Sequence, residues 1–186
     1  EVDRVLAILD RHVDSGGSAN RPDILRIDTL TGRASLELKN PGEVARWGLD
    51  FEGVPRFGVL THGEQSGAIY RENAQAPWRT ILPLQNRRSS LRPLGFDGAG
   101  SRILVGALNA EKRWAIYPLD PESGALGEPL LSDPVYDIVP EGTANAAGVG
   151  LVSTIFSRQK KALVGIRYYT ESSRVKWLDR DFAANQ

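Results

Sequence analysis

The sequence predicts an all-β protein, and two observations carry this prediction. Its 19 glycines and 11 prolines separate short apolar stretches, at intervals of roughly 8–12 residues that are typical of β-sandwiches, barrels and propellers. The chain also resembles itself at a spacing of about 46 residues, close to the length of one four-stranded propeller blade. The prediction is therefore a partial β-propeller of about three to four four-stranded antiparallel blades.

The repeat is clearest in two alignments that share one offset. Arg46–Leu60 aligns with Pro93–Leu108, so that two glycines and an aspartate coincide 47 positions apart. Further along, Ala68–Tyr70 aligns with Ala115–Tyr117 at the same offset of 47. Single glycines match easily by chance, but two separate matches at one offset indicate a repeated unit.

A turn motif repeats at twice this period. Asp28 and Gly32 follow one apolar stretch, and Asp120 and Gly124 follow another 92 residues later. Aspartate bonds its own downstream backbone and glycine accepts a positive φ, so both pairs are expected to be tight turns.

A weaker copy of the unit lies nearer the C-terminal end. Phe156 and Val164 correspond to Phe96 and Leu104 at an offset of 60. The extra residues are assigned to an insertion over residues 132–150, the longest stretch rich in proline, glycine and alanine. We therefore expect one domain, a propeller fragment over residues 1–186 with this insertion.

The individual elements follow from local patterns. Val2–Leu9 is either helix or strand, and strand is favoured because no cap precedes it and a glycine-rich turn follows. Continuously apolar Arg102–Leu108 and Lys161–Tyr168 fit inner strands, whereas alternating stretches indicate half-buried strands. A helix is expected to begin near Asp181. Further strands are expected over Ile24–Asp28, Ala34–Leu38, Ala68–Tyr70, Leu91–Phe96, Arg113–Leu119 and Val175–Leu178.

The glycine-rich stretch Asp97–Ser101 raises the alternative of a phosphate-binding loop. A dinucleotide fingerprint would need a third glycine at Ile103 and a following helix, but β-branched and apolar residues follow. The Lys-Ser/Thr pair of a P-loop is also missing. The stretch is therefore interpreted as the turn of a β-hairpin.

Composition excludes several classes of function. Lys plus Arg and Asp plus Glu both number 23, so no excess charge points to nucleic acid. Apolar runs are too short to cross a bilayer, so membrane insertion is not expected. The chain has no cysteine, which excludes disulfides, thiolate catalysis and cysteine-ligated metals.

The compartment stays open between cytoplasm and periplasm. A chain without cysteine suits either redox environment, and acidic residues occupy the first positions where a signal peptide has basic ones. There is no methionine anywhere, so the chain is interpreted as a segment of a longer protein.

No catalytic residue is predicted. Gly16–Asn20 is the nearest approach to a Gly-x-Ser-x-Gly elbow, but it lacks the final glycine and precedes no helix. His62 lies in "LTHGEQSGAIY", flanked by Gly63 and Gly67, and is interpreted as a hairpin-turn residue with a solvated imidazole. His12 is interpreted as a loop residue.

No metal, cofactor or ligand site is predicted either. Two histidines without cysteine form no ligand cluster. The carboxylate pairs Asp133/Asp137 and Asp179/Asp181 are interpreted as turn residues. The basic runs Arg87–Arg88 and Arg158–Lys161 are expected in solvated turns. Trp114 and Trp177 lie on expected strands, so the tryptophans are interpreted as blade core; the four are Trp47, Trp78, Trp114 and Trp177.

Four segments together resemble a known family. "DILRIDTLTGRASL", "APWRTILPL", "PLGFDGAGSRILVGA" and "LVGIRYYTESSRVKWLD" look like the N-terminal β-propeller of bacterial prolyl oligopeptidase-type serine peptidases, the dipeptidyl aminopeptidase/acylaminoacyl peptidase group. The likeness spans roughly residues 23–186. Each motif alone is a generic blade element, and their order and spacing carry the match.

The resemblance implies a non-catalytic role. In that family the propeller precedes an α/β-hydrolase domain that holds the Ser-Asp-His triad, and it caps the active site and restricts entry to short or unfolded peptides. The partners it implies are a C-terminal hydrolase domain and peptide substrates, and residues 132–150 are the candidate rim loop. No catalytic residue carries over. The alternative is a self-standing propeller, a scaffold or sensor that binds a protein, which predicts an exposed apolar patch on one rim.

Overall fold

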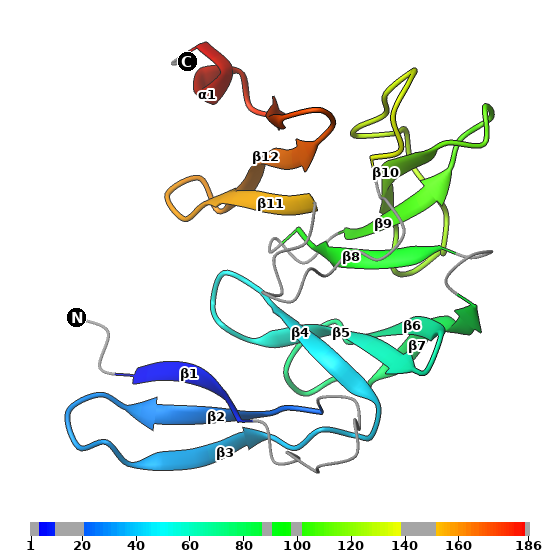
Figure 1. Cartoon of the computed structure of the whole chain (residues 1–186). Coiled ribbons are helices and arrows are strands. Elements are labelled where there is room, and N and C mark those ends of the chain that lie inside the picture. The colour runs from blue at the N-terminus through cyan, green and yellow to red at the C-terminus, as the bar shows by residue number, and fades with distance from the viewer. Residues whose placement is uncertain (1–3, 10–20, 87–90, 98–101, 139–151, 185–186) are drawn as a thin grey trace.

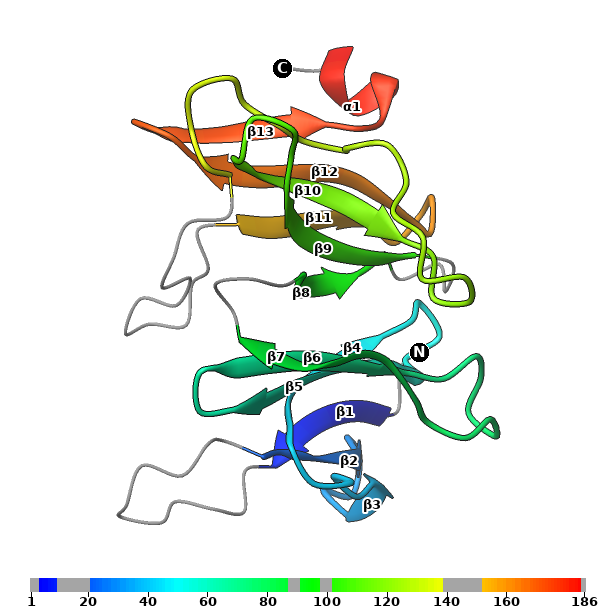
Figure 2. The same ribbon diagram turned by 90° about the vertical axis from the view of Figure 1, so that its right-hand side faces the viewer.

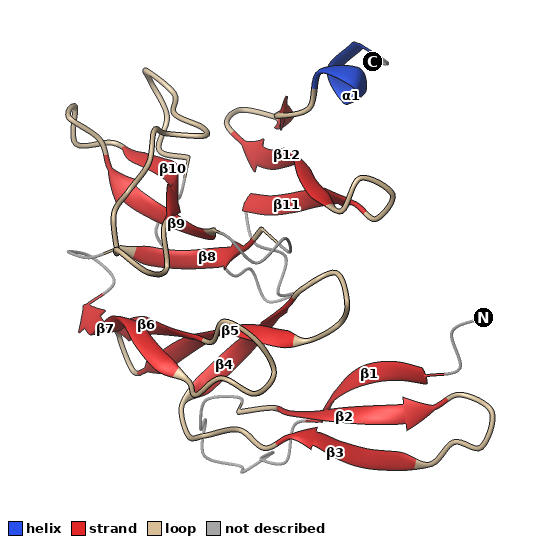
Figure 3. Cartoon of the chain, turned by 180° about the vertical axis from the view of Figure 1, so that it is seen from behind, coloured by secondary structure: helices blue, strands red, loops and turns tan. Residues whose placement is uncertain are grey.

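The structure is a computed structural model that describes residues 4–9, 21–86, 91–97, 102–138 and 152–184. Strands make up nearly all of its regular structure, with one short helix (Figure 3). The described elements are β1 (Arg4–Leu9), β2 (Asp23–Asp28), β3 (Ala34–Leu38), β4 (Val44–Leu49), β5 (Pro55–His62), β6 (Gln65–Tyr70), β7 (Arg79–Asn86), β8 (Arg92–Phe96), β9 (Ile103–Leu108), β10 (Trp114–Leu119), β11 (Val152–Ser157), β12 (Ala162–Tyr169), β13 (Ser173–Trp177) and α1 (Arg180–Ala184).

The strands form four antiparallel meanders that follow one another along the chain. Sheet A contains β1–β3, sheet B β4–β7, sheet C β8–β10 and sheet D β11–β13. Sheet A lies at one end of an open arc, sheet B follows it, and sheets C and D lie side by side beyond sheet B (Figure 1, Figure 2). The predicted all-β fold, an open partial propeller, is therefore confirmed.

The expected strands are found within one or two residues in most places, and Arg4–Leu9, the described part of Val2–Leu9, is a strand as favoured. The two continuously apolar stretches are the central strands β9 and β12. Asp97 N–H bonds Arg102 O at 3.1 Å, which closes the expected hairpin between β8 and β9. Residues 98–101 of that turn lie outside the described part of the chain.

Among the described residues the blades differ in their number of strands. Only sheet B has four; sheets A, C and D have three. In sheet C an irregular segment takes the fourth place, because Leu126 pairs with Leu119 and Leu131 pairs with Ile116 as isolated bridges. The proline- and glycine-rich sequence between these bridges prevents a continuous ladder.

The core lies between the sheets. One cluster joins sheets B and C and includes Phe57, Tyr70, Phe96, Ile103 and Leu119. A second cluster joins sheets C and D; its buried members are Trp114, Ile116, Leu131, Ile138 and Ile166. Because sheets B, C and D bury apolar faces against one another, these sheets stack like the blades of a propeller.

Sheet A is joined to sheet B by hydrogen bonds around Asn40, which we call the Asn40 hub. Asn40, on the connection between β3 and β4, donates its side-chain N–H groups to Val44 O at 2.7 Å and Pro22 O at 3.0 Å. Its backbone N–H bonds the buried carboxylate of Asp23 at 2.7 Å, and the Trp47 indole N–H donates to Pro22 O at 2.8 Å. These bonds satisfy polar groups at a junction that carries little apolar packing.

Candidate functional site

One face of the arc collects the turns that follow β2, β4, β6, β10 and β11, together with helix α1. We call this the exit face, because the last described element leaves the sheets there. Within each meander, the alternation of strand direction puts every second turn at the same end of the sheet. Figure 2 shows α1 and the turns after β6 and β10 on the same side.

Two turns of the exit face share the aspartate geometry that the sequence predicted. Asp28 accepts the backbone N–H groups of Leu30 and Thr31 at 3.0 and 2.8 Å. Asp120 accepts those of Glu122 and Ser123 at 2.7 and 2.9 Å.

In each of these turns a glycine completes the geometry. Gly32 and Gly124 have φ of 69° and 70°, in the left-handed region. The motif found 92 positions apart is thus the same turn, at the same end of sheets A and C.

A contact between sheets B and D crosses the exit face. Phe51, in the turn after β4, meets Phe156 of β11 edge-to-face with ring centroids 5.9 Å apart. Next to this pair, Lys161 Nζ lies 2.8 Å from Glu52 Oε1. We call these four residues the cross-blade contact. It joins the turn after β4 of sheet B to β11 and the turn after β11 of sheet D, two sheets that are not consecutive in the chain.

Helix α1 is held to the same face by a second charged group. Lys160 Nζ lies 2.8 Å from Asp179 Oδ2 and 2.6 Å from Asp181 Oδ2. These hydrogen bonds raise the pKa of Lys160, and the bond from Lys160 lowers the pKa of Asp179. The ring of Phe182 stacks on Trp177 with centroids 5.7 Å apart. The basic run Arg158–Lys161 is an exposed turn, as expected, and both of its lysines are also ion-paired.

Arginines and aromatic rings gather at the exit end of sheet B. Arg56 makes an ion pair with Asp50 at 3.2 Å and donates to the Tyr70 hydroxyl at 3.0 Å. The guanidinium of Arg79 lies over the Tyr70 ring at 5.5 Å. Arg71, the residue after β6, lies directly opposite Arg56 of β5, and its backbone N–H donates to Arg56 O at 2.9 Å.

Arg71 is held in place by backbone and by an indole ring. Its Nε donates to Pro55 O at 2.7 Å and one terminal nitrogen donates to Ala74 O at 2.9 Å. The guanidinium lies 4.6 Å from the centroid of Trp78, which in turn packs on Trp47 at 5.4 Å. Burial, and secondly the charge of Arg56, lowers the pKa of Arg71.

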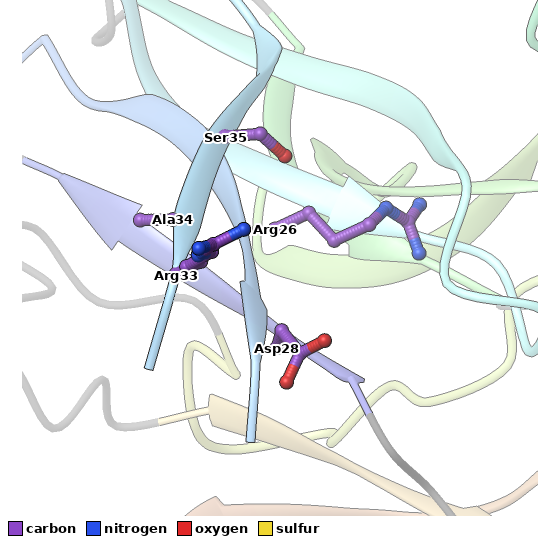
Figure 4. Close-up of a pocket in the computed structure, with 5 residues that line it drawn as sticks. All are labelled: Arg26, Asp28, Arg33, Ala34 and Ser35. Atoms are coloured by element: carbon purple, nitrogen blue, oxygen red, sulfur yellow. The ribbon is translucent and has the colours of Figure 1, made fainter. Parts of the chain in front are cut away.

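A shallow hollow of about 360 Å³ lies on the β2–β3 hairpin of sheet A. It is lined by Arg26, Asp28, Arg33, Ala34 and Ser35 (Figure 4). In the figure the Arg26 side chain extends away from Asp28 and Arg33. The Arg26 guanidinium is occupied by Glu37 through two hydrogen bonds of 2.8 Å, so it is not free to bind a ligand in the hollow.

His62 lies next to the turn between β5 and β6, as the sequence indicated. His62 ends β5, its side chain is 63% exposed, and its Nδ1 lies 2.7 Å from Glu43 Oε1. His12 and Gly16–Asn20 lie outside the described residues, as do Arg87 and Arg88. Among the described residues no group of three or more His, Asp or Glu is arranged to hold a metal ion.

The remaining sequence candidates have structural contacts. Asp133 accepts the backbone N–H groups of Val135 and Tyr136, and Asp137 accepts that of Trp114 at 2.7 Å. Trp114 is a core residue, as expected. The cluster of arginines around Tyr70 and Trp78 was missed, because its members are spread over three strands and only pairing brings them together.

The described part of the 132–150 insertion packs on sheet C. Ile138 is fully buried and its N–H bonds Trp114 O at 3.0 Å, at the start of β10. β11 begins at Val152, which pairs with Tyr168 near the end of β12. Both ends of the undescribed stretch 139–151 therefore lie at the face opposite the exit face.

Comparison with known proteins gives one structural similarity. The β-propeller domain of the Trilobed protease from Pyrococcus furiosus, described as having an open velcro topology, superposes with a TM-score of 0.46 at 10% sequence identity. The match covers 95% of this chain and 54% of that chain, so this chain spans about half of its length. No family model matches the sequence, and no curated protein matches it. The fold assignment rests on the strand order and pairing given above.

No helix in the described part of the chain is long and apolar enough to cross a membrane.

Proposed function

We propose that this chain is the non-catalytic propeller of a prolyl oligopeptidase-type serine peptidase and that it limits which peptides reach a triad on a following α/β-hydrolase domain. The order of the four family-like segments supports this role. The single structural observation that carries it is the position of α1. A domain that continues from α1 lies over the exit face, where the turns of all four sheets could screen its substrates.

On this proposal the gate is the exit face rather than the 132–150 insertion. The insertion was the candidate rim loop, but both of its described ends lie at the opposite face. The screening elements are instead the turns after β2, β4, β6, β10 and β11. Packed blades and bonded turns are rigid, and they would exclude folded proteins by size.

The test uses the chain together with the coding sequence that follows it in its gene. A fluorophosphonate probe should label one serine in the downstream part. Peptides from a dipeptide amide to an unfolded polypeptide should then be cleaved with kcat/KM falling as length rises. Double replacement of Phe51 and Phe156 by alanine loosens the cross-blade contact, and should raise cleavage of the longer substrates only.

Absence of a labelled serine would overturn the peptidase proposal. A length series unaffected by the double replacement would leave a peptidase but remove the gating role from the exit face. The control is replacement of exposed Val135 by alanine, which touches neither the cross-blade contact nor the core.

The alternative of a self-standing binding propeller has one observation in its favour. Leu30 and Leu36 on the β2–β3 hairpin are 79% and 49% exposed. Exposed apolar side chains on one rim suit a protein partner. If no serine is labelled, a partner search should start from this hairpin, with Leu30→Ser as the variant expected to lose the partner.

A further inference from the structure

We propose that Arg71 is a binding point for the carboxylate of an acidic peptide on the exit face. The choice of a peptide rests on the proposed function, whereas the choice of a carboxylate rests on the charges around Arg71.

The first argument is an unfavourable pairing. Arg56 lies on β5 and Arg71 follows β6. The two residues are directly opposite each other and are joined by the 2.9 Å backbone hydrogen bond. Like charges opposed across strands destabilise a sheet. The Arg56 side chain is only 14% exposed, so solvent screens the repulsion incompletely. Asp50, 3.2 Å from Arg56, offsets part of this repulsion, and an anion bound at Arg71 would offset the rest.

The second argument is the local balance of charge. Arg26 pairs with Glu37 and Arg56 with Asp50, and these two carboxylates act on Arg71 only at longer range. Arg71 makes no ion pair among the described residues. Its bonds go to two neutral carbonyl oxygens, of Pro55 and Ala74. The positive charge of Arg71 therefore has no carboxylate in ion-pair contact among the described residues, and the carboxylate of a peptide would supply one.

The third argument is preorganisation. The guanidinium of Arg71 is fixed by two carbonyls and by the Trp78 ring, and Trp78 is backed by Trp47. Trp47 is itself anchored through the 2.8 Å bond to Pro22 O. An arginine that is already ordered loses little rotamer entropy when it binds, which favours affinity.

The binding test uses the chain itself and a dye-labelled peptide of alternating glutamate and glycine. A peptide with glutamine in place of glutamate is the matched ligand, and fluorescence anisotropy at low salt is the readout. We expect the glutamate peptide to bind and the glutamine peptide not to bind. Arg71→Gln should weaken binding on the order of tenfold, the loss expected for a charged hydrogen bond.

Arg33→Gln is the control variant, because Arg33 is an exposed arginine on the same face. It should change the Kd by less than about twofold. Equal losses in both variants would show diffuse electrostatic attraction and overturn the assignment to Arg71. Equal binding of the two peptides would overturn the proposal that the site recognises a carboxylate.

A measurement on the unaltered chain guards against a folding defect in Arg71→Gln. The side-chain Nε–Hε resonance of Arg71 should shift on addition of the glutamate peptide, while that of Arg33 stays in place. No shift at Arg71 would overturn the site. Because this measurement needs no hydrolase domain, its result does not depend on whether a serine is labelled in the longer protein.

Discussion

Aspartates at the start of turns are the residues that organise the exit face. Asp50 uses one carboxylate oxygen to accept the backbone N–H groups of Glu52 and Val54, as Asp28 and Asp120 do in their turns. A side chain that satisfies its own turn needs no tertiary partner. For this reason the spacing of aspartate and glycine could be interpreted from sequence alone.

The Asp120 turn predicts a measurable pKa. Bonds from the N–H groups of Ser123 and Glu122 lower the pKa of Asp120 below the ordinary value of about 4. The folded-state pKa is the lower one, so the turn stabilises the fold above the unfolded pKa, and this is lost as pH falls through the folded pKa. Carboxyl-carbon NMR should find Asp120 titrating below a random-coil aspartate. An ordinary pKa would contradict the bonding.

A single methyl group added at Gly67 is expected to destabilise the fold. A Cβ there would lie 2.7 Å from Leu82 O and 3.0 Å from Leu84 N, both backbone atoms of β7. Gly67→Ala should lower the free energy of unfolding by about 1–3 kcal/mol. Chemical denaturation measures this.

Gly95→Ala is the matched control for Gly67, because nothing lies within 4 Å of its Cβ position. It should be neutral or stabilising by less than about 1 kcal/mol. Equal losses at the two glycines would show that the close approach of β6 and β7 is not the cause.

At the scale of elements, β7 is a strand that the sequence analysis did not predict. β7 has no fully buried residue and contains Pro83. Its strand character comes from pairing with β6, and proline is tolerated because β7 is an edge strand. Inner strands β9 and β12 were predictable, because burial on both faces leaves a continuous apolar run in the sequence.

The irregular edge of sheet C predicts an asymmetry between two aliphatic residues. Ile138 is fully buried in the core between sheets C and D, whereas Val135, three residues earlier, is 70% exposed. Ile138→Ala should lower the free energy of unfolding by about 2–5 kcal/mol. Val135→Ala should change it by less than about 0.5 kcal/mol. Thermal denaturation compares them, and a mild Ile138→Ala would mean that this segment is not part of the core.

At the scale of the whole molecule, the sheets are joined unevenly. Sheets B, C and D share apolar clusters, and the cross-blade contact adds a link between B and D. Sheet A depends on the Asn40 hub and a few buried residues such as Ile24. Sheets B to D therefore form the stable body on which the exit face is built.

The cross-blade contact predicts coupling between sheets B and D. In a double-mutant cycle, Phe51→Ala and Phe156→Ala should show an interaction energy of about 0.5–1.5 kcal/mol. Phe51→Ala combined with Phe182→Ala should be additive, since Phe182 stacks on Trp177 instead. Urea unfolding of the variants measures both cycles. Additivity of Phe51 and Phe156 would contradict the contact.

The sequence by itself determined the all-β class, most strands, and the repeated turns, because each depends on residues close together in the chain. Periodicity, a turn aspartate and a glycine with positive φ act within a few residues.

Only the tertiary structure decided which turns share a face, and so where the arginines around Tyr70 and Trp78 meet. It also decided that the insertion enters and leaves at the opposite face. Strand pairing joins residues that are far apart in sequence, and no local pattern records which partners they acquire.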